Sequence, residues 1–126
     1  MTLFHVLAIA LCSSSPLLDV TDTIDRGGTA VYTVSLDGET AYWITLQSQS
    51  GATDLNIAAV SNEMNFEEFM NLPYGNDFLY ALEFAIVAGL EEGDESLTLN
   101  ALYSGPVYIV VHDAGGGGGQ FILSIL

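Results

Sequence analysis

Short runs of alternating apolar and polar residues begin near Asp19 and continue to the end of the chain. In the run 29–36, Tyr32, Val34 and Leu36 alternate with hydroxyl side chains. This period of two is typical of β-strands that bury one face. Comparable runs are 42–46, 54–60, 96–100, 107–112 and 120–126. Because no helical pattern recurs between the runs, the sequence predicts an all-β fold, an antiparallel β-sandwich of about seven strands.

The alternation also predicts which side chains face the core. In the run 42–46, Tyr42, Ile44 and Leu46 share the inward face, whereas Trp43 lies on the polar face.

Two glycine-containing segments predict turns. Asp37-Gly38 suits a tight hairpin turn. The glycines at 115–119 predict a flexible hairpin connection between the last two strands. Alternatively, the backbone of another subunit approaches there, which the absence of side chains permits. The glycine run is not a phosphate-binding loop, because no Lys-Ser/Thr follows it and it precedes a strand.

The segment 62–94 interrupts the strand pattern and is interpreted as an insertion. Its residues 65–70 resemble a helical turn with Asn65 as N-cap and acidic residues close behind. Residues 78–90 are apolar on nearly every side. Such a segment is either buried in the core or exposed as a surface that binds a partner.

The N-terminal segment, residues 1–15, carries an apolar run from residue 3 to residue 11. This run is well short of the roughly 20 residues that a helix needs to cross a bilayer. As an extension strand, the run would place large aliphatic side chains on one face. These side chains belong to Leu3, Leu7, Ile9 and Leu11. A Ser-rich hinge ending at Pro16 would join this strand to the sandwich, residues 16–126.

Three interpretations of the N-terminal segment stay open. The first is an uncleaved donor strand. The second is a cleaved signal peptide, for which the apolar run has a suitable length although no Lys or Arg precedes it. The third is a lipid anchor at Cys12, which the bulky Leu11 disfavours.

The chain is strongly acidic, because 16 Asp and Glu residues stand against a single base, Arg26, and the formal charge is −15. Such a surface repels phosphate backbones, which excludes nucleic-acid binding, and it disfavours anionic membranes. Copies of the chain also repel one another at low salt. Self-assembly therefore requires screening salt, divalent cations, low pH or an apolar interface. Cys12 is the single cysteine, so no intramolecular disulfide forms.

Candidate catalytic and metal-binding residues are few. His5 and His112 are the two histidines, and His112-Asp113 is more typical of a strand end than of a catalytic dyad. The shortage of Cys and His excludes a structural zinc site. The sequence therefore predicts no enzymatic activity, no catalytic or metal-binding residues and no cofactor.

Calcium is the one metal for which the chain offers suitable oxygen ligands. They occur in the acidic run 91–95 and in the series Asp19, Asp22 and Asp25. Neither group matches a known calcium loop, and acidic segments are usually just solvated. We note calcium only as an alternative to the absence of a cofactor.

Several fragments follow one another in the order and spacing of a known domain family. They are 28–36 with Tyr32-x-Val34-x-Leu36, 42–46, 53–57, 104–111 and 119–123. Together they resemble the bacterial or archaeal pre-peptidase C-terminal domain, with Asn56 in place of the second acid of its D-φ-D-φ strand and with a longer insertion. The resemblance implies a jelly-roll-like sandwich, secretion and an accessory role beside a protease or another enzyme. No protease precedes the domain in this sequence, so we expect a freestanding copy to have a different role.

Two functions follow from these observations. The first is a non-enzymatic subunit of an extracellular filament or cell-surface assembly, joined head-to-tail by insertion of its N-terminal strand into a neighbouring copy. The predicted interface residues are Leu3, Leu7, Ile9, Leu11, Phe78, Ile86 and Leu90. The alternative is a secreted accessory module that binds polysaccharide or protein through exposed aromatic side chains. Candidates for that contact are Trp43, Tyr74, Tyr80 and Tyr103.

Overall fold

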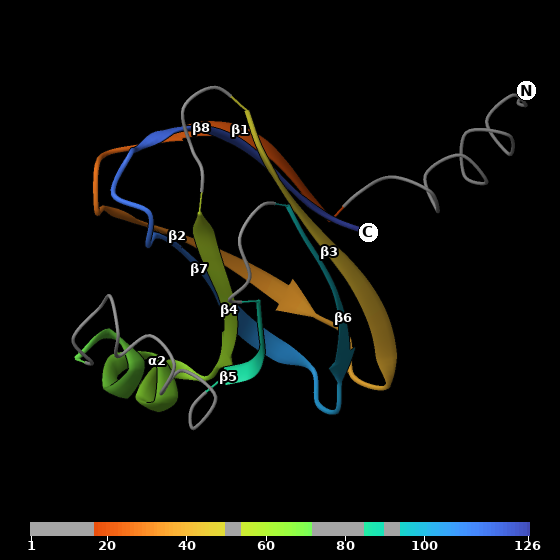
Figure 1. Cartoon of the computed structure of the whole chain (residues 1–126). Helices are drawn as coiled ribbons and strands as arrows, with labels where there is room; N and C mark the ends of the chain where they lie inside the picture. Colours follow the sequence, from red (N-terminus) through yellow and green to blue (C-terminus); the bar gives the residue numbers. More distant parts are fainter. Residues whose placement is uncertain (1–16, 50–53, 72–84, 90–93) are drawn as a thin grey trace, which may run out of the picture.

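The computed structural model describes residues 17–49, 54–71, 85–89 and 94–126, which form a β-sandwich with one short helix (Figure 1). The strands are β1 (Leu18–Ile24), β2 (Thr29–Leu36), β3 (Thr40–Ser48), β4 (Leu55–Ser61), β5 (Ala85–Gly89), β6 (Glu95–Ala101), β7 (Gly105–Asp113) and β8 (Gly119–Ile125). One sheet has the order β1-β8-β3-β6 and the other the order β2-β7-β4-β5, and all neighbouring strands are antiparallel.

Consecutive strands alternate between the two sheets, except for β4 and β5, which pair with each other. This is the strand arrangement of a jelly roll. The predicted antiparallel, jelly-roll-like sandwich is therefore confirmed. β5 lies inside the predicted insertion, within the apolar segment 78–90, and it adds a strand to the approximate number predicted.

The core lies between the two sheets and is built from alternate residues of the strands. On β3, Ile44 and Leu46 are buried, whereas Trp43, the residue before Ile44, is 56% exposed, as the alternation predicts. On β8, Phe121 and Leu123 are fully buried. The removal of these apolar side chains from water is the main favourable contribution to folding.

A second, smaller buried layer lies on the outer face of β4. The helix α2 (Glu63–Met70) places Phe69 there with no exposed surface, and its Phe66 ring stacks on Tyr108 of β7 with ring centroids 4.2 Å apart. Figure 1 shows α2 beside the end of β4. Because Ala58 and Val60 on this face are apolar, β4 is buried on both faces.

The helix begins three residues earlier than predicted. Its N-cap is Asn62, whose side-chain oxygen accepts a hydrogen bond from the backbone N–H of Asn65 at 2.9 Å. Asn65, which the sequence predicted as the N-cap, therefore lies in the first turn of the helix, and its backbone N–H donates to the cap. Both asparagines are suitable caps, but the earlier one adds a turn of backbone hydrogen bonds, beginning with Phe66 N–H to Asn62 C=O at 3.1 Å.

The Asp37-Gly38 turn does not connect a hairpin, because β2 and β3 belong to different sheets. Its backbone bonds instead to the loop between β6 and β7. Gly38 N–H donates to Ser104 Oγ at 2.8 Å, and Glu39 N–H donates to the carbonyl of Ala101 at 2.6 Å. A turn does form here, but the residue with positive φ is Glu39 at 61° and not Gly38, and the partner of each strand is decided by packing across the sandwich.

The predicted N-terminal extension strand lies outside the described residues. In the part of the chain that the structure describes, no helix has the length and apolar character needed to cross a membrane.

We expect Phe69→Ala to lower the free energy of unfolding by about 3–5 kcal/mol, because it removes a fully buried ring and leaves a cavity beneath α2. The matched control is Met64→Ala on the exposed side of the same helix, which should change stability by less than about 0.5 kcal/mol. Denaturant unfolding followed by circular dichroism measures both. Equal effects of the two substitutions would show that α2 is not docked on β4.

Candidate functional site

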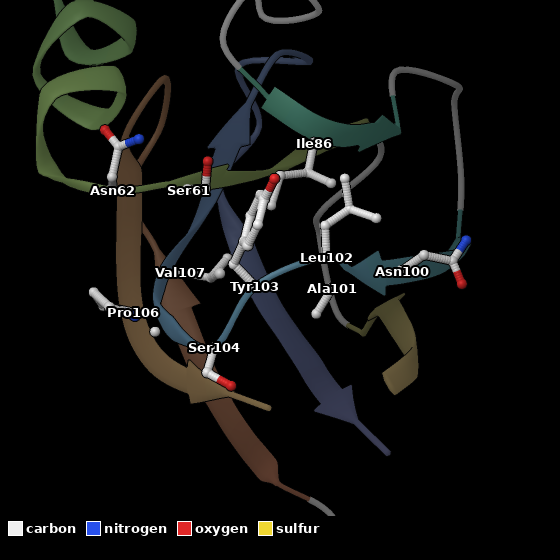
Figure 2. Close-up of a pocket in the computed structure, with 11 residues that line it drawn as sticks. Ser61, Asn62, Ile86, Asn100, Ala101, Leu102, Tyr103, Ser104, Pro106 and Val107 are labelled. Atoms are coloured by element: carbon white, nitrogen blue, oxygen red, sulfur yellow. The ribbon is translucent and has the colours of Figure 1, made fainter. Parts of the chain in front are cut away.

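A pocket of about 310 Å³ opens where the loop between β6 and β7 meets β5 and the end of β4 (Figure 2). Its walls come from segments far apart in the sequence. The lining residues are Ser61, Asn62, Ile86, Asn100, Ala101, Leu102, Tyr103, Ser104, Gly105, Pro106 and Val107. None of these described lining residues carries a carboxylate or a basic group, although the chain has a formal charge of −15.

The loop between β6 and β7 is held by its ends, so that its middle projects outward. The carbonyl of Ala101 and the hydroxyl of Ser104 accept the backbone N–H groups of Glu39 and Gly38. Between these anchors, the side chain of Leu102 is 75% exposed and that of Tyr103 is 85% exposed. Large apolar side chains at such exposure, beside a pocket, are typical of a surface that binds a partner.

Ile86 lies on β5, lines the pocket and is 43% exposed. Of the predicted interface residues, it is the one within the described part of the chain. Leu3, Leu7, Ile9, Leu11, Phe78 and Leu90 lie outside it. Of the four candidate aromatic contacts, Trp43 and Tyr103 are exposed, and Tyr74 and Tyr80 lie outside the described residues. Sequence reasoning did not identify the pocket itself, although the adjacent Leu102 and Tyr103 after a predicted strand were a usable signal.

At the opposite end of β7, the carboxylate of Asp113 is buried and binds backbone groups of two loops. It accepts hydrogen bonds from Gly27 N–H at 3.0 Å, Gly116 N–H at 3.1 Å and Gly118 N–H at 2.7 Å. The glycine run 115–119 therefore crosses from one sheet to the other and is anchored by a side chain. It is not the flexible hairpin connection that was predicted, because β7 and β8 do not pair with each other.

His112 is also buried. It lies near the end of β7, opposite Thr29 at the start of β2. Its Nδ1 is 3.1 Å from the hydroxyl of Thr29, and Asn56 is its neighbour on β4. Burial lowers the pKa of His112, and a hydrogen bond to the backbone of Gly28 and the charge of Asp113 act in the opposite direction. The pKa of the ring is thus below its ordinary value, so the neutral form is favoured inside the fold. His112 lies at the end of β7, which is the position that the sequence predicted for it.

The strand geometry separates the acidic side chains of β1. Asp19 and Asp22 are three residues apart, so their side chains lie on opposite faces. Asp22 accepts a hydrogen bond from the hydroxyl of Tyr32 at 2.6 Å, which lowers the pKa of the carboxyl group. Among the described residues, no three His, Cys, Asp or Glu side chains gather closely enough to hold a metal ion.

Comparison with known proteins shows the fold of the chain. No family model matches it, and no curated protein does. Among solved structures, the pre-peptidase C-terminal domain of a collagenase from Bacillus anthracis is similar, with a TM-score of 0.58, 15% identity, and coverage of 88% of this chain and 90% of that one. The chain therefore has the fold of the domain that its sequence resembles.

Two further structures share this fold. CorA, a surface-associated copper-binding protein of Methylomicrobium album BG8, has a TM-score of 0.57 at 10% identity and covers 86% of this chain and 92% of its own. The periplasmic g-type lysozyme inhibitor PliG of Aeromonas hydrophila has a TM-score of 0.52 at 16% identity, with 90% and 85% covered.

We expect Asp113→Asn to destabilise the protein by about 1–3 kcal/mol, because an amide has one accepting oxygen where the carboxylate binds three backbone N–H groups with two. The control Asp37→Asn, at an exposed turn, removes the same charge without such a loss. Thermal unfolding of both variants separates the two effects. Equal melting temperatures would contradict the anchoring role of Asp113.

The buried, neutral His112 predicts a loss of stability on mild acidification. Because its pKa is lower in the folded protein than the ordinary value of 6.5, the unfolded chain binds the proton more tightly. The stabilising contribution is complete above pH 6.5 and declines as the pH falls below it. His112→Asn should flatten the dependence of unfolding free energy on pH in that window, as measured by urea titrations at pH 7.5, 6.5 and 5.5. An unchanged slope in the variant would contradict this assignment.

Proposed function

We propose that the protein is a non-enzymatic subunit of an extracellular assembly, in which the apolar N-terminal segment of one copy adds to the neighbouring copy. The observation that carries this proposal is the uncharged pocket beside β5 and β6, with Leu102, Tyr103 and Ile86 exposed around it. The extracellular setting is supported by the sequence resemblance and by two proteins of the same fold, which are described as surface-associated and periplasmic.

Electrostatics limits where two copies can touch. Each chain carries a formal charge of −15, so contacts between acidic surfaces are repulsive. The segment 3–11 contains no acidic residue, and the described pocket lining contains none either. A contact between these two parts therefore places no acidic side chain of one against an acidic side chain of the other.

The strand order supplies a place for an added strand near the pocket. Among the described strands, β5 and β6 are each outermost in their sheet, and the pocket includes Ile86 of β5 and Asn100 of β6. An extended segment can pair its backbone with such an edge while its side chains enter an adjacent pocket. Each aliphatic side chain that becomes fully buried contributes about 1.5–3 kcal/mol, and several are needed to offset the entropy lost on association.

The donor segment and the acceptor pocket are different parts of the molecule. Such a heterologous contact leaves a free donor on one end and a free acceptor on the other. Repetition therefore produces a fibre, or a ring if the rotation between subunits closes. This is the physical basis for proposing a head-to-tail homopolymer.

We expect the full chain to be monomeric at about 0.01 M salt, where charges interact over roughly 30 Å, and to assemble at about 1 M salt, where the range falls to roughly 3 Å. Deletion of residues 2–12 should abolish assembly at high salt. Leu102→Asp should weaken it strongly, because a carboxylate would enter the uncharged pocket rim. Sedimentation velocity and electron microscopy measure the assembled fraction.

The matched control is Met64→Asp, which adds the same charge at another exposed apolar position that does not line the pocket. This variant should assemble as the parent does. Fibres formed by the deletion variant would refute the donor role of the N-terminal segment. Equal behaviour of the two aspartate variants would refute the pocket as the acceptor.

A further inference from the structure

The outer face of the sheet β1-β8-β3-β6 is a second exposed surface, distinct from the pocket. Its side chains lie in rows that cross the strands. In one row, Trp43 pairs with Thr98 on one side and exchanges two backbone hydrogen bonds with Leu126 on the other, at 3.1 and 2.9 Å. Leu17 continues this row on the strand beyond. Trp43, Leu126 and Leu17 are all exposed, so one end of the face is apolar.

The adjacent rows of this face are polar and almost uncharged. Thr45 pairs with Ser124 and with Ser96, and Gln47 pairs with Ile122 in the next row. In the described strands of this sheet, Asp19 is the one outward side chain with a charge. It lies on the edge strand β1 at the end of the Thr45 row, where it accepts a hydrogen bond from Ser124 Oγ at 3.2 Å. On a chain with 16 acidic residues, this face is therefore set apart by its neutrality.

Trp43 is both exposed and held in place. Its indole N–H donates a hydrogen bond to Ser96 Oγ on the neighbouring strand at 2.6 Å, while the side chain stays 56% exposed. The N–H group of the indole thus has its hydrogen-bond acceptor within the protein, and the exposed apolar ring is available for contact with a partner. An aromatic ring fixed in this way loses little conformational entropy on binding.

We propose that this outer face binds a neutral polysaccharide, with a sugar ring stacked on Trp43 and sugar hydroxyls bonded to the Ser, Thr and Gln side chains of the adjacent rows. The C–H groups of a sugar ring suit the electron-rich face of an indole. The net charge of the chain repels anionic polymers, whereas an uncharged polymer meets no such barrier. A protein partner is a poorer match, because the hydroxyl and amide rows would form the centre of its interface, where apolar side chains are usual.

This binding is independent of the proposed assembly. Trp43, Thr45 and Leu126 do not line the pocket, so substitutions on one surface leave the other intact. Binding to an uncharged ligand is also insensitive to salt, whereas assembly is not. Because the residues and the salt dependence differ, an experiment can refute polysaccharide binding without refuting assembly, and the reverse.

The experiment uses the full chain at low salt and affinity gel electrophoresis in gels that contain hydroxyethyl cellulose, galactomannan, dextran or, as the anionic control, polygalacturonate. We expect retardation in at least one neutral polymer and none in polygalacturonate. Trp43→Ala should weaken binding by about tenfold or more, as truncation of a central aromatic contact does. Ser96→Ala removes the acceptor of the indole N–H hydrogen bond but leaves Trp43 in the chain, and it should weaken binding several-fold. Tyr103→Ala at the pocket should have no effect.

Trp43 is the single tryptophan of the chain, so its fluorescence reports on this surface directly. A saturable change in emission on addition of the retarding polymer is expected, and circular dichroism of Trp43→Ala verifies that the variant is folded. Migration unchanged in all neutral polymers would overturn the proposal. So would equal retardation of folded Trp43→Ala, or retardation in polygalacturonate alone. Concentration-dependent dimers that require Trp43, without any retardation, would assign the face to a second copy of the chain instead.

Discussion

The alternation of successive strands between two sheets is the constraint on which the structure depends. Because successive strands, apart from β4 and β5, lie in opposite sheets, most connections cross an end of the sandwich and cannot be tight hairpins. Such crossing loops have backbone groups that no strand partner satisfies. At one end Ser104 and the carbonyl of Ala101 supply the missing partners, and at the other the Asp113 carboxylate does. In these described loops, side-chain and carbonyl acceptors thus replace the strand partners that the topology does not provide.

The charge of the chain influences which of its surfaces can come into close contact with another copy. An acidic surface keeps copies of the chain apart at low salt, and close contact between copies meets the least repulsion at the uncharged areas. Two such areas lie within the described residues, namely the pocket around Leu102 and Tyr103 and the sheet face around Trp43. They adjoin at β6, which supplies Asn100 to the pocket and Ser96 to the sheet face. They differ in chemistry, since the first is a concave apolar site and the second is a surface of hydroxyl and amide groups.

Sequence reasoning was most successful where the cause is local. The inward Ile44 and the outward Trp43 follow from the period of two, and the order of the fragments indicated the fold that the comparisons show. It failed where two local signals were equivalent, as for Asn62 and Asn65 at the start of α2. It also failed at Asp37-Gly38, because turn propensity does not specify which strands pair. The pocket was not predicted, because its walls come together only in the folded chain.

In the loop between β6 and β7, the groups that hold the backbone in place are not the side chains that are exposed. The contacts that hold it use a backbone carbonyl and the Ser104 hydroxyl, and none of them involves the side chains of Leu102 or Tyr103. These two positions can therefore change their chemistry while the backbone around them keeps its shape. A loop of this kind allows the exposed side chains to vary at little cost to folding.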